Sequence, residues 1–185
     1  LRIILAQSAR KNDPGNTEWT TNGGGFNINH NYGFGVIDAG AAVALARTWT
    51  NVSPQLVFPS ATATVNLAIP DNNTTGVSST INVAGSGIGR IEFVEITFNG
   101  THTFVGDLDI TLTAPSGTGT VSRLSEPHSC PGGCLGVPSN TWRFGSARHL
   151  GEAANGSWTL SVKDLVPVDT GTFTSWQLTF YGRLN

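Results

Sequence analysis

Several carboxylate and amide side chains in this chain could coordinate a hard cation. Asp107 and Asp109 are two residues apart in a strand-like segment, so we expect them to share one face. Asp164 and Asp169 bracket a turn near the end of the chain, and Asp71 opens an Asp-Asn-Asn turn. Calcium binds roughly six to eight such oxygens, so we expect one calcium ion where the fold brings two of these groups together. The same residues are also ordinary turn formers, and none forms an EF-hand loop.

The two cysteines, Cys130 and Cys134, flank a Pro-Gly-Gly tripeptide. In an oxidising compartment we expect them to form a disulfide that closes this small loop. A zinc site is the alternative, but it needs further thiol or imidazole ligands. His128 is the one such residue close by in the sequence.

Histidine is the usual general base beside a serine nucleophile, and the chain has 4 histidines. We interpret His30 as a structural residue at a packed domain edge. We interpret His102 as hydrogen-bonded within the β-structure, and His128 and His149 as loop residues. The sequence therefore gives no catalytic residue.

The composition is that of a turn-rich extracellular β-protein. Of 185 residues, 38% are hydrophobic, 12% are charged and 23 are glycine, and the formal net charge is −2. The absence of basic runs argues against nucleic acid and against an anionic membrane surface as partners. No apolar stretch has the length needed to span a bilayer. We expect a secreted or extracellular protein, with the periplasm as a stage of transit.

The apolar spacing and the capping residue within residues 1–51 predict two short helices. Asp38 is the expected N-cap of the second helix, which should run from Ala39 to about Trp49. The first helix is predicted by apolar residues at helical spacing, namely Leu1, Ile4, Leu5 and Ala9. Apolar helices this short are unstable alone in water. We therefore expect this segment to be the end of a larger body, and the chain to be a fragment.

From residue 52 onward the apolar period changes to two. The last two segments each place an apolar row on one face: Trp158, Leu160, Val162, and then Trp176, Leu178, Phe180. Strands at this spacing predict a mainly β fold, a two-sheet sandwich or jelly roll. A phase slip near Phe93 predicts a β-bulge. We expect the tryptophans in the core, whereas an exposed aromatic row would indicate a sugar-binding surface.

Motifs in both parts of the chain carry a family resemblance. In the second part they are Thr101–Ile110 with Gly-Asp-Leu, Leu112–Thr118 with Pro-x-Gly-Thr, Trp142–Phe144, Gly151-Glu152, Gly156–Asp164, Gly171 and Trp176–Gly182. Together they resemble the P domain of kexin- and furin-like proprotein convertases, which also occurs in bacterial secreted subtilisin-like proteases. In the first part, Leu1–Ala9 and His30–Ala39 resemble the end of the kexin-like catalytic domain.

The resemblance implies two domains: a subtilisin-like catalytic-domain remnant at 1–51 and a galactose-binding-like jelly-roll P domain at 52–185. It implies that the P domain packs on the catalytic domain of the same gene product, stabilises it and helps to place substrate. The family carries its nucleophile in Gly-Thr-Ser, which this chain lacks, so we expect no peptidase activity of the chain itself. The Cys130–Cys134 loop departs from the eukaryotic pattern and favours a bacterial relative.

Two other functions are compatible with a jelly-roll scaffold. One is an independent extracellular binding module for carbohydrate or a surface polymer. The other is an inert structural or assembly domain. Burial of Trp142, Trp158 and Trp176 would count against the binding module.

Overall fold

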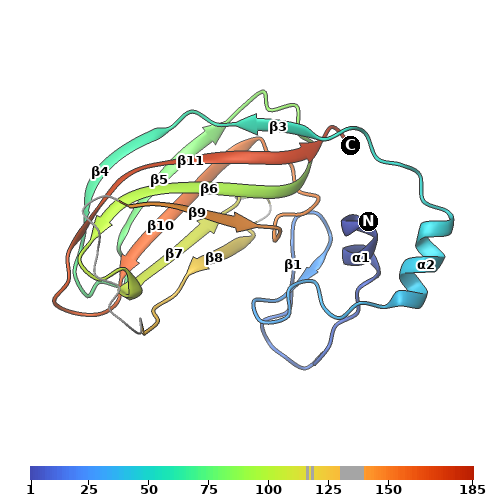
Figure 1. Cartoon of the computed structure of the whole chain (residues 1–185), viewed down its shortest axis with the longest axis horizontal. Helices are drawn as coiled ribbons and strands as arrows, with labels where there is room; N and C mark the ends of the chain where they lie inside the picture. Colours follow the sequence, from blue (N-terminus) through green and yellow to red (C-terminus); the bar gives the residue numbers. More distant parts are fainter. Residues whose placement is uncertain (116, 118, 130–139) are drawn as a thin grey trace.

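The computed structural model describes residues 1–115, 117, 119–129 and 140–185. The main body is a sandwich of two antiparallel sheets, and the N-terminal segment lies against one end of it (Figure 1). Strands dominate and the helices are short, so the predicted mainly β fold is confirmed. No helix in these ranges is long and apolar enough to cross a membrane.

Each sheet is built from strands that are distant in sequence. Within the described residues, the first sheet has the order β5-β10-β7-β8, with bounds Val77–Val83, Gly156–Asp164, Leu108–Thr113 and Val121–Ser125. The second has the order β3-β11-β6-β9, and β4 also pairs with β11. Its bounds are Leu56–Pro59, Gly171–Arg183, Arg90–His102, Asn140–Ser146 and, for β4, Ala63–Ile69. A 3₁₀ turn, η1 (Val105–Asp107), leads into β7.

The core lies between the two sheets, where the predicted apolar rows meet. Every residue of the two rows on β10 and β11 is fully buried, as expected from alternation along a strand. Trp158 donates its indole N–H to the Ala154 carbonyl at 2.8 Å, and Trp176 donates to Ser79 Oγ at 2.9 Å. Trp142 is half-buried and stacks on Phe98. All three tryptophans therefore belong to the core or pack against it.

The predicted β-bulge is confirmed. Tyr181 of β11 lies opposite Phe93 of β6, but the next residue, Gly182, lies opposite Ile91. Glu92 is therefore the extra residue on β6, which accounts for the phase slip in the sequence.

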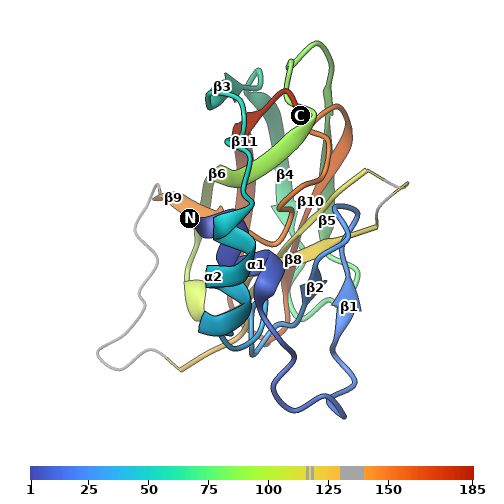
Figure 2. The ribbon, with the colours of Figure 1, turned by 90° about the vertical axis from the view of Figure 1, so that its right-hand side faces the viewer.

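The N-terminal segment holds two helices, α1 (Arg2–Ser8) and α2 (Ala39–Arg47), and a small hairpin of β1 (Thr20–Thr21) and β2 (Asn27–Ile28). Asp38 caps α2 as predicted, because its Oδ1 accepts from the Ala41 N–H at 2.8 Å. Helix α2 ends two residues before the expected Trp49. The two helices lie side by side at the end of the sandwich (Figure 2).

Candidate functional site

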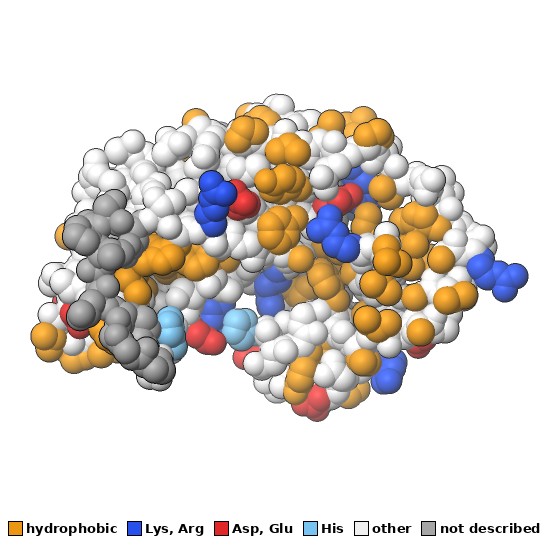
Figure 3. Space-filling model, in the orientation of Figure 1, with side chains coloured by type: hydrophobic (Ala, Val, Ile, Leu, Met, Phe, Trp, Pro, Cys, Tyr) orange, Lys and Arg blue, Asp and Glu red, His pale blue; other side chains and the backbone are white. Residues whose placement is uncertain are grey.

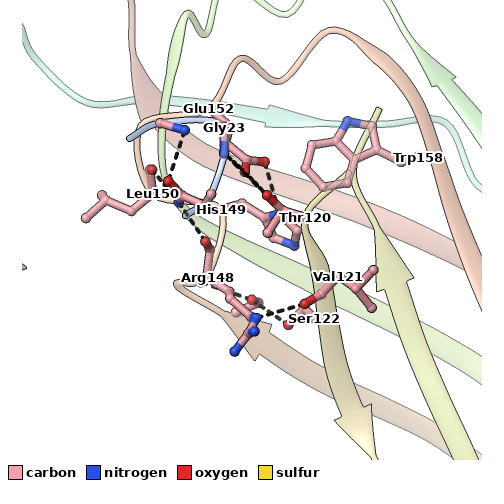
Figure 4. Close-up of polar contacts among 12 residues, drawn as sticks. Gly23, Thr120, Val121, Ser122, Arg148, His149, Leu150, Glu152 and Trp158 are labelled. Atoms are coloured by element: carbon pink, nitrogen blue, oxygen red, sulfur yellow. Dashed lines mark hydrogen bonds and ion pairs between the residues drawn. The ribbon is translucent and has the colours of Figure 1, made fainter. Parts of the chain in front are cut away.

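A glycine loop of the N-terminal segment, residues 22–26, docks onto the loop that connects β9 to β10, and this contact is the junction between the two parts of the chain (Figure 4). The Asn22 side chain donates to the Arg148 carbonyl at 2.8 Å and to the Leu150 carbonyl at 2.9 Å. Its Oδ1 accepts from the backbone N–H groups of Gly24 and Phe26. A Cβ on Gly24 would lie 2.2 Å from the Leu150 carbonyl oxygen. The two backbones therefore approach more closely than any residue with a side chain would allow.

Glu152 is the centre of this junction. It is 2% exposed and accepts hydrogen bonds from the Gly23 N–H at 2.8 Å, from Thr120 Oγ1, and from His149 Nδ1 at 3.1 Å (Figure 4). Burial alone raises the pKa of Glu152, but the hydrogen bonds from His149 and Thr120, the His149 charge and the Gly23 N–H outweigh burial and lower it. Glu152 is therefore an ionised carboxylate that receives donors from both parts of the chain.

His149 pairs with Glu152 in a geometry that resembles an oriented catalytic base. The ring is fully buried, lies edge-on to Trp158 with centroids 4.9 Å apart, and faces Glu152 through Nδ1. Its Nε2 has no hydrogen-bond partner among the described residues. A base must reach its nucleophile through this second nitrogen, and here no described hydroxyl group meets it. The pair therefore fixes the loop before β10.

A second buried histidine–carboxylate pair lies at the other end of the sandwich. His102 Nε2 is 3.2 Å from Asp164 Oδ2, its Nδ1 is 2.7 Å from the Phe104 carbonyl, and both side chains are fully buried. The interpretation of His102 as hydrogen-bonded inside the sandwich is confirmed. His30, expected at a packed edge, is instead exposed and lies 3.7 Å from Glu126. His128, a loop residue as predicted, places its Nδ1 2.8 Å from the Glu126 carbonyl.

The five predicted calcium ligands do not all come together. Asp107 belongs to η1 and not to the strand, Asp109 lies on β7 opposite Lys163, and the shared face that alternation predicted is absent. Asp164 ends β10, and Asp169 lies in the turn between β10 and β11. Asp71 accepts from the Val168 N–H of that same turn at 3.0 Å and 3.2 Å.

Asp107 is the carboxylate whose environment is most unusual. It is 5% exposed, and its Oδ2 has no hydrogen-bond partner among the described residues. Burial, the charges of Asp164 and Asp169, and the Asp169 side chain together raise the pKa of Asp107, while His102 lowers it. Within the described ranges, no group of three or more His, Cys, Asp or Glu side chains is placed to hold a metal ion. The predicted Cys130–Cys134 disulfide lies outside those ranges.

An apolar pocket of about 320 Å³ opens between α1 and the junction. Its walls are mainly apolar side chains of α1 together with Phe34, Ile37 and Leu150. Hydrophobic side chains gather over this end of the molecule, around both helices (Figure 3). Leu1, Ile37 and Val43 are among the exposed large apolar residues of the chain.

The fold of the chain occurs in a serine protease. It matches the crystal structure of the serine protease of Aeromonas sobria with a TM-score of 0.83 and 24% sequence identity, over 98% of this chain and 40% of that one. The match includes the N-terminal segment as well as the sandwich. The chain therefore shares its fold with about 40% of that protease.

Residues 91–180 match the family described as the proprotein convertase P-domain, and the sandwich of this chain belongs to that family. Human proprotein convertase subtilisin/kexin type 7 is 31% identical over 187 residues, covering 98% of this chain and 23% of that protein. Rat furin is 30% identical over 199 residues, covering 98% of this chain and 23% of that protein. The chain thus spans about a quarter of the length of these relatives.

Proposed function

We propose that this chain is the accessory P domain of a secreted subtilisin-like serine endopeptidase, joined to the last segment of its catalytic domain. Residues 1–51 are that last segment and residues 52–185 are the P domain. The P domain stabilises the catalytic domain of the same gene product and helps to position substrate. The chain lacks the Gly-Thr-Ser motif in which the family carries its nucleophile, so we expect no hydrolysis by the chain alone.

The observation that carries this proposal is the apolar surface of the N-terminal segment. Helix α1 buries Ile4 and α2 buries Ala42, while Ile37 is 60% and Val43 is 62% exposed. Contiguous exposed apolar surface on a soluble protein marks an interaction site. The segment is also fastened to the sandwich through Asn22 and Glu152, so a partner bound to its helices is held in fixed relation to the P domain.

Binding to the folded catalytic domain is how the P domain would stabilise the enzyme. A surface that binds only the folded catalytic domain shifts the folding equilibrium of that domain by mass action. The proposal is supported by two relatives, a proprotein convertase and furin, and by the matching fold of a serine protease. The independent binding module is not favoured, because Trp158 and Trp176 are buried and no longer free to form a flat aromatic surface.

Two assays test the proposal. The 185-residue chain should neither cleave casein nor react with an active-site serine reagent. The longer gene product should lose activity at least several-fold faster on heating when residues 52–185 are removed. Turnover by the chain alone, or an unchanged inactivation half-life after the deletion, would contradict the proposal.

A further inference from the structure

A hollow lies between the N-terminal segment, at residues 28–34, and the side of the sandwich formed by β8 and β9. It consists of two cavities of about 290 Å³ and 350 Å³, and His30 and Arg123 line both of them. Arg148 lines the first cavity and His128 the second. Basic and histidine side chains are visible around this hollow in Figure 3. In a chain with a formal net charge of −2, the hollow therefore collects two arginines and two histidines.

Arg148 brings hydrogen-bond donors that the described residues leave unfilled. Its Nε donates to the Val121 carbonyl at 2.8 Å, which fixes the guanidinium beside the first residue of β8. Among the residues that the structure describes, its two terminal nitrogens have no partner. Figure 4 shows this end of the side chain pointing away from Glu152 and the junction. A half-buried cation thus presents two free N–H edges to the first cavity.

The charges around the hollow do not fully compensate Arg148. Burial lowers the pKa of Arg148, the charge of Glu18 opposes this effect, and the charge of Arg123 adds to it. Glu126 lies 3.0 Å from Arg123 and 3.7 Å from His30, so this carboxylate is already shared by two other groups. A guanidinium stays charged in proteins, so an anion bound to Arg148 would offset the cost of its burial.

We propose that this hollow binds an acidic peptide segment, with one peptide carboxylate on the terminal nitrogens of Arg148. A guanidinium donates two parallel N–H···O bonds to a carboxylate, and this paired geometry favours arginine over a point charge. Ile28, Phe34 and Leu124 form apolar walls that contact the neighbouring residues of the peptide. Glu126 at the rim repels a multiply charged inorganic anion more strongly than a carboxylate.

The free edge of β8 extends this contact. In the described part of the chain β8 is the outer strand of its sheet. It runs from Val121, which accepts from Arg148, to Ser125, which lines the second cavity. An extended peptide bonds to such an edge through its own backbone. A peptide along β8 therefore reaches both cavities. The binding needs no protease activity, so its failure would leave the proposed function untouched.

Fluorescence anisotropy of a labelled glutamate-rich peptide with the whole 185-residue chain tests the proposal. The control peptide has glutamine in place of every glutamate. At physiological ionic strength we expect saturable binding of the acidic peptide and roughly tenfold weaker binding of the control peptide. Arg148→Gln should weaken binding of the acidic peptide by about tenfold or more. Arg143→Gln, at an exposed arginine of β9 that lines neither cavity, is the matched control and should bind like wild type.

Glu126→Gln tests the proposal through a gain of binding, which a folding defect would not produce. The substitution frees Arg123 and His30 from a competing carboxylate, so it should tighten binding of the acidic peptide by roughly two- to fivefold. If Arg148→Gln fails to fold, the exposed Glu126→Gln decides. No binding by wild type, equal binding of the two peptides, or no tighter binding by Glu126→Gln would overturn the proposal. Displacement of the peptide by an equal concentration of inorganic phosphate would show a general anion site and would also overturn it.

Discussion

Glu152 is the residue on which the junction between the two parts of the chain depends. Its carboxylate is buried, and its donors come from three segments: the N-terminal loop, the residue just before β8 and the loop before β10. A buried charge is tolerated only when its hydrogen-bonding capacity is filled. Removing the charge should therefore loosen the N-terminal loop before it affects the sandwich core.

We predict that Glu152→Gln lowers the free energy of unfolding by about 1–3 kcal/mol and increases proteolysis of residues 20–30. The amide keeps one acceptor oxygen, which can serve either Gly23 and Thr120 or His149, and it places N–H donors against the other side. Glu95→Gln, on the outer face of β6, is the control. Urea unfolding and limited proteolysis measure both effects. Equal protease resistance of the two variants would contradict the prediction.

The ionisation of Glu152 also predicts a pH dependence. Its pKa in the folded chain lies below the ordinary value of 4.5, so the folded state binds fewer protons than the unfolded state between the two pKa values. The stabilisation is therefore fully present above pH 4.5 and is lost as the pH falls through the folded pKa. The Tm difference between wild type and Glu152→Gln should shrink below pH 4.5, and a constant difference would argue against this assignment.

At the scale of elements, the N-terminal segment and the sandwich are joined by close backbone contact between two loops, residues 22–26 and the loop before β10. Gly24 lies directly against the Leu150 carbonyl, and the Asn22 side chain closes the loop around it. Loops that meet backbone to backbone need glycine at the contact, because a methyl group has no space there.

Gly24→Ala should consequently be much more harmful than an alanine at an unconstrained glycine. We predict a loss of about 1–3 kcal/mol from overpacking, with faster hydrogen exchange in residues 22–26. Gly15→Ala is the control, because a Cβ at Gly15 meets nothing within 4 Å. Denaturant titration and exchange mass spectrometry provide the measurements. Equal stability and equal hydrogen exchange of the two variants would show that the loop of residues 22–26 is not tightly packed, and would contradict the prediction.

The sequence predicted the elements well and the polar contacts poorly. Alternation located the rows on β10 and β11, and the phase slip located the bulge at Glu92. Alternation wrongly placed Asp107 in a strand, because an apolar period of two does not show where a strand begins. In the structure Asp107 belongs to the 3₁₀ turn η1, which precedes β7. The role of Glu152 could not be derived, since its donor Gly23 is 129 residues away. The one sequence signal for a role of Glu152 is that the Gly151-Glu152 dipeptide belongs to the family motif.

At the scale of the whole molecule, the apolar side chains around α1 and α2 should control association. Ile37 is 60% and Val43 is 62% exposed. We predict that Ile37→Ser with Val43→Ser reduces self-association of the isolated chain and binding of a hydrophobic dye, with a Tm change within about 2 °C. Val57→Ser, at a similarly exposed position on β3, is the control. Sedimentation velocity measures self-association, and fluorescence measures dye binding. Values equal to those of wild type in the double variant would contradict the prediction.

The Gly24–Leu150 contact has a consequence for building chimeric proteins. Grafting the sandwich alone onto a foreign domain would leave the Glu152 carboxylate without its Gly23 donor and the Leu150 carbonyl without Asn22. The transplantable unit is therefore the sandwich together with residues 22–26. The covalent connection near residues 51–55 can change in length more freely, since alignment of the two parts is set by the glycine loop.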